Sequence, residues 1–270
     1  MTRIQTALLL FPAWLCFPAW LGAQTAAADD VPAAERSSLA FLRAHMPAED
    51  AHALDDAFLR ENVRLAHLAR ARVPWGRALS DELFRGYVLP YAQATERREA
   101  WRRMLFERCL PLVDGCNTPG EAARRLNETV FELFSVHYST GRRRADQAPS
   151  ESIEQQKASC TGLSILLADA CRACCVPARL VSVRRPHKTG NHTWVEVWDG
   201  EAWRFCGADE PDPQGLDRAW FVGDAARCAD ADRAHRIWAV SCAPAGARCR
   251  PGWSRDAELW GVDVTDRYAR

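Results

Sequence analysis

The first half of the chain has the hydrophobic pattern of amphipathic helices. Between residues 29 and 145, apolar residues recur three and four positions apart, which places them on one face of each helix. The positions that carry this pattern are Leu54, Phe58, Leu65, Leu68, Trp101, Leu105, Cys109, Leu112, Leu126, Val130, Leu133 and Phe134. One helix start is marked by Thr118, which can cap it, by Pro119, which fits the first turn, and by Glu121, which can bond back. We therefore predict a helical N-terminal region.

The pattern changes after about residue 146. An apolar stripe from Leu163 to Cys174 predicts a buried helix, and Pro177 ends it. Strands are expected at 180–183, at 193–198, where side-chain character alternates, and at 202–206, 237–240 and 261–264. Asp199 and Gly200 form a typical two-residue hairpin turn. The predicted fold class is α+β, with a cysteine-bearing helix packed on an antiparallel sheet.

The first residues have the order of a secretory signal. Arg3 precedes an apolar run at 7–21, and the small residues 26–28 follow it. The run contains two prolines and is shorter than the ~20 apolar residues of a spanning helix. We expect an exported, secreted or periplasmic protein that has no membrane span after signal removal; the alternative is a retained amphipathic anchor. The expected organisation is 1–28 signal peptide, 29–145 helical region, 146–225 core and 226–270 C-terminal strands completing the core.

Charge excludes one class of partner. Lys plus Arg and Asp plus Glu both number 35, and the arginines are scattered, so no basic surface indicates nucleic acid binding.

Ten cysteines remain after the signal, and in an oxidising compartment some should pair. Cys109 with Cys116, and Cys242 with Cys249, are close enough in sequence to be candidates. The Cys171-x-x-Cys174 pair could indicate zinc or thiol exchange, but no second pair has metal-ligand spacing. Both lie on the buried stripe, so burial is the simpler explanation, and we expect neither a metal nor an organic cofactor.

Two residues stand where a thiol site could form. Cys160 directly precedes the buried helix, whose unpaired N–H groups and positive dipole end favour thiolate. His192 begins the strand at 193–198, and a base on a strand can be held against a helix-borne thiol. Taken singly, each also fits a structural role, as a buried cysteine or a surface histidine.

Together they carry a family resemblance. The runs CTGLS at 160–164, CRA at 171–173 and VPAR at 176–179 resemble the cysteine helix of transglutaminase-like domains. NHTWVEVW at 191–198, followed by Gly200 and Trp203, resembles the His-x-Trp-x-Glu-Val strand of that superfamily. The similar core spans 150–221, and the flanking stretches 72–76 and 262–268 resemble exported transglutaminase-like proteins. The chain departs from the pattern at Ala158-Ser159 and at Cys174-Cys175.

The resemblance implies a papain-like site in which Cys160 is the nucleophile and His192 is its base. Such a site attacks a protein or peptide carboxamide, forms a thioester, and passes it to water or to an amine. Gln155 lies where related thiol enzymes place an oxyanion donor, although it could equally be a surface glutamine. The alternative is an inactive binding or scaffold module with the same fold. Retention of both Cys160 and His192 favours the enzyme.

Two arguments disagree on the third catalytic group. A two-residue turn pairs Trp198 with Glu201 and His192 with Gly207, which places Asp209 diagonally from His192 on the same face. Transglutaminase-like domains place their carboxylate directly before a proline, which here is Glu210. A bulge at Gly207 would bring Glu210 to the histidine. We favour Glu210 and keep Asp209 as the alternative.

Overall fold

A computed structural model describes residues 32–269, and residues 33–270 form one compact unit. The expected signal peptide, 1–28, lies outside the described residues. Across the described range, no helix combines the length and apolar character that crossing a membrane requires.

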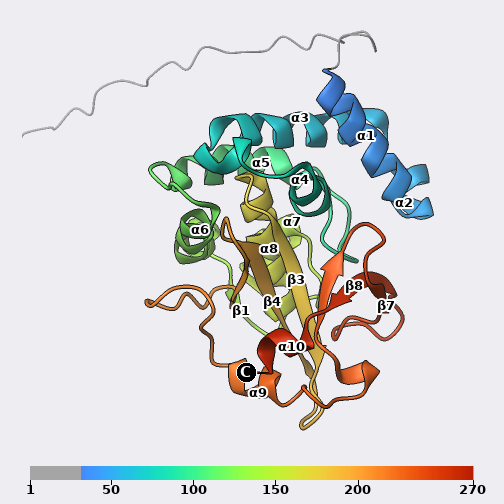
Figure 1. Ribbon diagram of the computed structural model, residues 1–270, viewed down its shortest axis with the longest axis vertical. Helices are drawn as coiled ribbons and strands as arrows, with labels where there is room; N and C mark the ends of the chain where they lie inside the picture. Colours follow the sequence, from blue (N-terminus) through green and yellow to red (C-terminus); the bar gives the residue numbers. More distant parts are fainter. Residues whose placement is uncertain (1–31, 270) are drawn as a thin grey trace, which may run out of the picture. The chain divides into compact units, whose positions relative to one another are not determined.

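The N-terminal region is helical, and its helices gather at one end of the sheet (Figure 1). Its elements are α1 (Ala33–His45), α2 (Ala48–Ala53), α3 (Asp56–Arg72), the 3-10 turn η2 (Pro74–Arg77), α4 (Asp81–Tyr87), α5 (Trp101–Cys109), the 3-10 turn η3 (Leu110–Val113) and α6 (Pro119–Phe134). α6 begins as the sequence predicts, because the Thr118 hydroxyl accepts the N–H of Glu121 at 3.1 Å.

The second half forms the sheet and the helices that cover it. Its elements are β1 (His137–Tyr138), α7 (Pro149–Gln155), β2 (Lys157–Ala158), α8 (Cys160–Ala173), β3 (Ala178–Arg184), β4 (Asn191–Trp198), β5 (Trp203–Cys206), α9 (Val222–Ala226), the 3-10 turn η4 (Arg233–His235), β6 (Trp238–Ser241), β7 (Ala247–Cys249), β8 (Leu259–Asp263) and α10 (Thr265–Tyr268). β1 and β2 pair in parallel, and the six-stranded antiparallel sheet has the order β5-β4-β3-β6-β8-β7. The predicted α+β class, with its cysteine-bearing helix and helical N-terminal region, is confirmed.

The central strands are buried on both faces. α8 packs against β3 and β4 (Figure 1), and the side chains of Leu180, Val195 and Val197 belong to the core on that face. Val181 and Trp194, which alternate with them, lie in a second core on the opposite face. Alternate residues of β4 therefore contact different layers, so neighbouring residues at the start of β4 face opposite sides of the sheet.

The hairpin between β4 and β5 differs from the prediction. Trp198 pairs with Trp203 and not with Glu201, so residues 199–202 form the loop. The side chain of Asp199 is the physical reason, because its Oδ1 accepts the N–H groups of Glu201 and Ala202 at 2.8 and 2.7 Å and closes a longer turn. The register moves by two residues, which preserves the faces, and the β4–β5 ladder ends where Val195 pairs with Cys206.

Candidate active site around Cys160 and His192

Cys160 is the first residue of α8, as the sequence predicts, and its side chain is half-buried. Ser159 occupies the N-cap position without capping the helix, since its hydroxyl donates to the carbonyl of Ala145 at 3.3 Å. No side chain therefore caps the first turn of α8 within the described structure. The thiol stands beside these N–H groups, which favour negative charge on a thiolate or on a nearby oxyanion.

His192 is the second residue of β4, and its side chain is 7% exposed. Its ring lies among Trp194, Trp220 and Phe221, with centroid distances of 5.7, 4.9 and 4.7 Å. Burial, assisted by the positive charge of Arg185, lowers the pKa of His192 to about 4. The imidazole is therefore neutral at neutral pH, which is the form that can accept a proton.

The residues next to Cys160 and His192 touch each other. The hydroxyl of Thr161 lies 3.1 Å from that of Thr193, and both side chains are buried. The hydroxyl of Ser164, one helical turn later, donates to the carbonyl of Thr193 at 3.3 Å. The start of α8 and the start of β4 are thus fixed side by side, although no hydrogen bond between the thiol and the imidazole exists in the described part of the chain.

The carboxylate of Glu210 and the ring of His192 both contact Trp220. Glu210 Oε2 accepts the indole N–H of Trp220 at 2.8 Å, and the same indole contacts the imidazole. The chain turns tightly here, with a bridge between Gly207 and Glu210. A Cβ on Gly207 would lie 2.4 Å from Glu210 Oε2, so the carboxylate rests directly over the glycine. Burial raises the pKa of Glu210.

Asp209 has a different neighbour. Its Oδ2 lies 3.4 Å from Nδ1 of His137, and its backbone, at φ +65°, donates its N–H to Asn127 Oδ1 at 3.1 Å. The structure gives Asp209 no contact with His192 among the described residues. His137 lies in β1, opposite Lys157 of β2, close in the chain to Cys160. Sequence patterns did not identify His137, because a two-residue strand has no periodicity.

Gln155 is the last residue of α7, and both ends of its amide have partners. Oε1 accepts the backbone N–H of Arg143 at 3.0 Å, and Nε2 donates to the carbonyl of Glu151 at 2.9 Å. These bonds hold the side chain along α7, and its role as an oxyanion donor stays a prediction.

Two aromatic side chains at the site are unusually exposed. Tyr138 is 60% exposed and Trp220 is 59% exposed. Tyr138 pairs with Ala158, two residues before Cys160, and Trp220 contacts His192. The candidate nucleophile and the candidate base are therefore each associated with an apolar surface, which sequence periodicity could not reveal.

The cysteines other than Cys160 give no metal or disulfide site in the described range. All ten described cysteines are free thiols, and no cluster of three His, Cys, Asp or Glu is placed to hold a metal. Cys171 and Cys174 are fully buried, and burial raises the pKa of both. The expected pair of Cys242 and Cys249 is not joined, because the thiol of Cys242 donates to the carbonyl of Ala92 at 3.2 Å and that of Cys249 faces Gly261.

The other expected pair, Cys109 with Cys116, is also not joined. Both thiols are buried, at 0% and 6% exposure, and burial raises the pKa of each.

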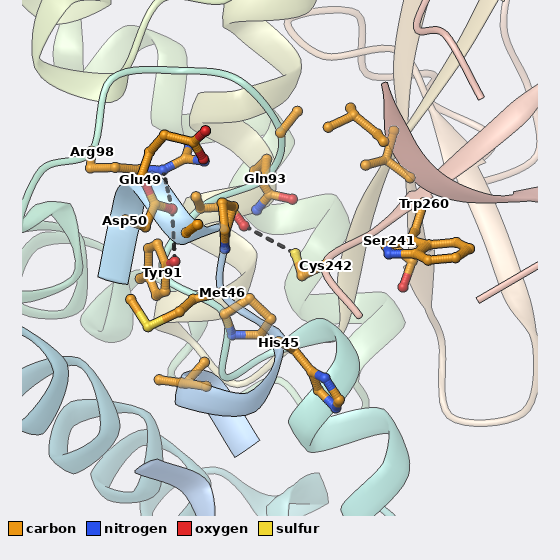
Figure 2. A pocket seen from close by; sticks show the side chains of 18 of the residues that line it. His45, Met46, Glu49, Asp50, Tyr91, Gln93, Arg98, Ser241, Cys242 and Trp260 are labelled. Atoms are coloured by element: carbon orange, nitrogen blue, oxygen red, sulfur yellow. Dashed lines mark hydrogen bonds and ion pairs between the residues drawn. The ribbon is translucent and has the colours of Figure 1, made fainter. Parts of the chain in front are cut away.

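A cavity of about 440 Å³ lies elsewhere, between α1, α2, the segment 90–98 and strands β6 to β8 (Figure 2). Figure 2 shows its polar wall, where Asp50 Oδ2 accepts hydrogen bonds from Tyr91 and from Arg98, both at 2.8 Å. Neither Cys160 nor His192 lines it. The cavity is thus separate from the candidate thiol site.

Comparisons with known proteins address the same segment. Residues 108–208 match the family model of the transglutaminase-like superfamily, a range that contains Cys160 and His192 and ends just before Asp209. No curated protein matches the sequence at a significant level. A solved structure from Cytophaga hutchinsonii, described as a candidate cysteine protease, is similar at 17% identity with a TM-score of 0.34. The match covers 60% of this chain and 57% of that one, so this chain spans little more than half its length.

Proposed function

We propose that this protein is a thiol enzyme acting on a protein or peptide carboxamide, since residues 108–208 match the family model of the transglutaminase-like superfamily. Cys160 is the nucleophile and His192 is its base. The observation that carries the proposal is the Thr161–Thr193 contact, which holds the first residue of α8 beside the start of β4. A half-buried thiol at an uncapped helix start and a neutral imidazole on the adjoining strand supply a nucleophile and a proton acceptor for acyl transfer.

The reaction uses groups of this chain alone. The imidazole of His192 takes the proton of the Cys160 thiol, and the thiolate attacks the carbonyl carbon of the substrate. The resulting oxyanion accepts hydrogen bonds from the N–H groups at the start of α8. The imidazolium then protonates the departing amine, and the C–N bond breaks to leave a thioester. Water or a second amine, deprotonated by His192, attacks the thioester and restores the thiol.

Glu210 is proposed as the group that orients His192, with Asp209 as the alternative. The contact of Glu210 with Trp220, whose ring packs on the imidazole, supports this order. Asp209 is instead beside His137. The oriented carboxylate would fix the imidazole tautomer and stabilise the imidazolium.

Export is proposed from residues 1–28 alone. The charged start, the apolar run and the small residues before Asp29 form the order of a signal peptide. N-terminal sequencing of protein collected from the medium or periplasm should find a chain that begins near Asp29. A chain retaining Met1 inside the cell would contradict it.

A binding module without catalysis is the second candidate. It is favoured by the imidazole of His192, which is buried among aromatic rings and has no hydrogen bond to the thiol in the structure as described. In such a module, Tyr138 and Trp220 would supply apolar contact area for a protein partner.

Alkylation of the native protein with iodoacetamide separates the two candidates. Cys242 is the reference thiol outside the site, because burial raises its pKa. The enzyme predicts that alkylation of Cys160 keeps most of its rate between pH 8 and pH 6, since activated thiols titrate at roughly pH 3.5–7.5 rather than ~8.5. A Cys160 rate that falls about tenfold with each pH unit, as expected for an unactivated thiol such as Cys242, supports the binding module.

Two histidine variants identify the base. His192→Ala should slow alkylation of Cys160 at pH 6 by about tenfold or more, because the thiol loses the imidazole that accepts its proton. His137→Ala should leave the rate unchanged, although His137 also has a carboxylate neighbour. The reverse result would assign the base to His137.

A further inference from the structure

The imidazole of His192 has an unmet hydrogen bond. Its Nε2 atom is buried and has no partner in the described structure. A buried polar atom without a partner destabilises the folded state, so such an atom in a folded protein calls for an explanation. The carboxylate of Glu210 is joined to the neighbourhood of this ring through Trp220, to which one of its oxygens is bound.

Trp220 lies between the two groups. Its indole Nε1 donates to Glu210 at 2.8 Å, and its ring centroid lies 4.9 Å from that of His192. The side chain is 59% exposed and belongs to the irregular segment between β5 and α9. It can therefore turn outward without opening the core.

We infer that Trp220 is a positioning residue that controls whether Glu210 reaches His192. In the resting protein, the indole N–H holds the carboxylate of Glu210. When that bond is absent, the carboxylate accepts the Nε2–H of His192 and orients the imidazole with Nδ1 as the proton acceptor. The inference rests on the proposed function, because it takes His192 as the base of Cys160.

Other charged groups face His192, and the test substitutes none of them. Arg185 and Lys188, from the turn between β3 and β4, disfavour the imidazolium, and Asp224 of α9 favours it. Lys188 Nζ lies 2.5 Å from Asp224 Oδ2, so these two charges largely offset each other. The guanidinium of Arg185 lies 5.6 Å from the centroid of the Trp220 ring, so a change of titration in a Trp220 variant reports Glu210, Arg185 or solvent.

The test uses Trp220→Phe, which keeps an aromatic ring over His192 and removes the N–H. The freed carboxylate should raise the pKa of His192, measured by NMR of its ring protons, by about 1 pH unit or more. Alkylation of Cys160 at pH 6 should become about tenfold faster, since each unit added to the pKa of His192 favours proton transfer from the thiol to the imidazole tenfold. Trp253→Phe is the matched control, because its indole N–H donates to Thr95 at 3.2 Å away from the site.

A second variant separates the carboxylate from solvent. In Trp220→Phe/Glu210→Gln, both gains should disappear, whereas Glu210→Gln alone should leave the pKa of His192 close to that of the parent. Trp220→Leu serves if the Phe variant does not fold. An unchanged His192 pKa in a folded Trp220 variant, or a gain that survives Glu210→Gln, would overturn the inference. The proposed function fails separately, if His192→Ala leaves alkylation of Cys160 unaltered.

Discussion

At the scale of single residues, His192 shows how burial sets chemistry. Its strand position follows from the alternation of 193–198, but the rings that desolvate it, Trp220 and Phe221, come from a segment nearly 30 residues later. Desolvation disfavours the charged imidazole, which makes it a neutral acceptor at neutral pH. The same desolvation links the protonation of this residue to the stability of the whole protein.

We predict that His192 makes the protein less stable in acid. The pKa of His192 is about 4 in the folded protein and 6.5 in the unfolded chain, so the unfolded chain binds more protons between these values. The contribution to stability is complete above pH 6.5 and is lost as the pH falls toward 4. At pH 4.5 the loss is about 2–3 kcal/mol. Urea unfolding at pH 7 and pH 4.5 measures it, and His192→Gln should reduce the difference by that amount. An equal acid loss in His192→Gln would refute the assignment.

Asp169 leads to the opposite expectation. It is fully buried in α8, where Gln93 Nε2 donates to its Oδ1 at 2.9 Å. Its Oδ2 and the Oε1 of Gln93 both lack partners, and burial raises the pKa of Asp169 well above its usual value. A proton on Oδ2 would turn one unpaired acceptor into a donor. Because the folded state then holds the extra proton, stability falls as pH rises.

Asp169→Asn should therefore be tolerated, since an amide imitates the neutral acid. We expect its free energy of unfolding to stay within about 1 kcal/mol of the parent at pH 7 and to fall less as the pH rises above the ordinary aspartate range, from pH ~5 to pH ~9. Denaturant unfolding at these pH values is the measurement. A loss of several kcal/mol in Asp169→Asn would mean that the carboxylate is charged.

At the scale of elements, hydrophobic periodicity predicted the helices and strands whose positions are determined by burial of one face. α8 and β4 appear where the sequence places them, because an apolar stripe and an alternating run each need one partner surface. The prediction of a two-residue turn between β4 and β5 was wrong, because the side chain of Asp199 accepts hydrogen bonds from two backbone N–H groups of the loop. Hydrophobic periodicity carries no information on such bonds. The sequence indicated an irregularity at Gly207, but not the contact of Glu210 with Trp220, which depends on the space that Gly207 leaves for the carboxylate.

Gly207→Ala tests that dependence. The new Cβ would lie 2.4 Å from Glu210 Oε2, so the carboxylate must leave its place and its bond to Trp220 must break. We expect a loss of about 1–3 kcal/mol in the free energy of unfolding and a shift of the Trp220 indole N–H resonance. Gly223→Ala is the control, because a Cβ there meets nothing within 4 Å. A Trp220 resonance that stays in place in Gly207→Ala would show that Glu210 is held by something else.

At the scale of the whole molecule, the helical region and the sheet are joined by buried polar bonds as well as by packing. Arg102 of α5 donates to Asn62 of α3 at 2.7 Å, to the carbonyl of Arg172 of α8 at 3.1 Å and to three carbonyls of the segment 88–90. Burial, and then the nearby charge of Arg172, lowers the pKa of Arg102 to about 9, so it stays protonated at neutral pH. The sequence could not predict this role, since Arg102 and Arg103 are adjacent in the same helix and only the structure separates them.

Arg102→Met should therefore weaken the protein as a whole. The variant leaves several buried carbonyls of α8 and the segment 88–90 without a donor, so we expect a loss of about 3 kcal/mol or more. Since α3, α5 and α8 also share one hydrophobic core, the helical region and the sheet should still unfold in one calorimetric transition at a lower Tm. Arg103→Met is the matched control: its bond to Glu61 is exposed, at 2.7 Å, and its loss should cost no more than about 1 kcal/mol. Equal losses in the two variants would show that the buried bonds of Arg102 add nothing to the packing that joins the two regions.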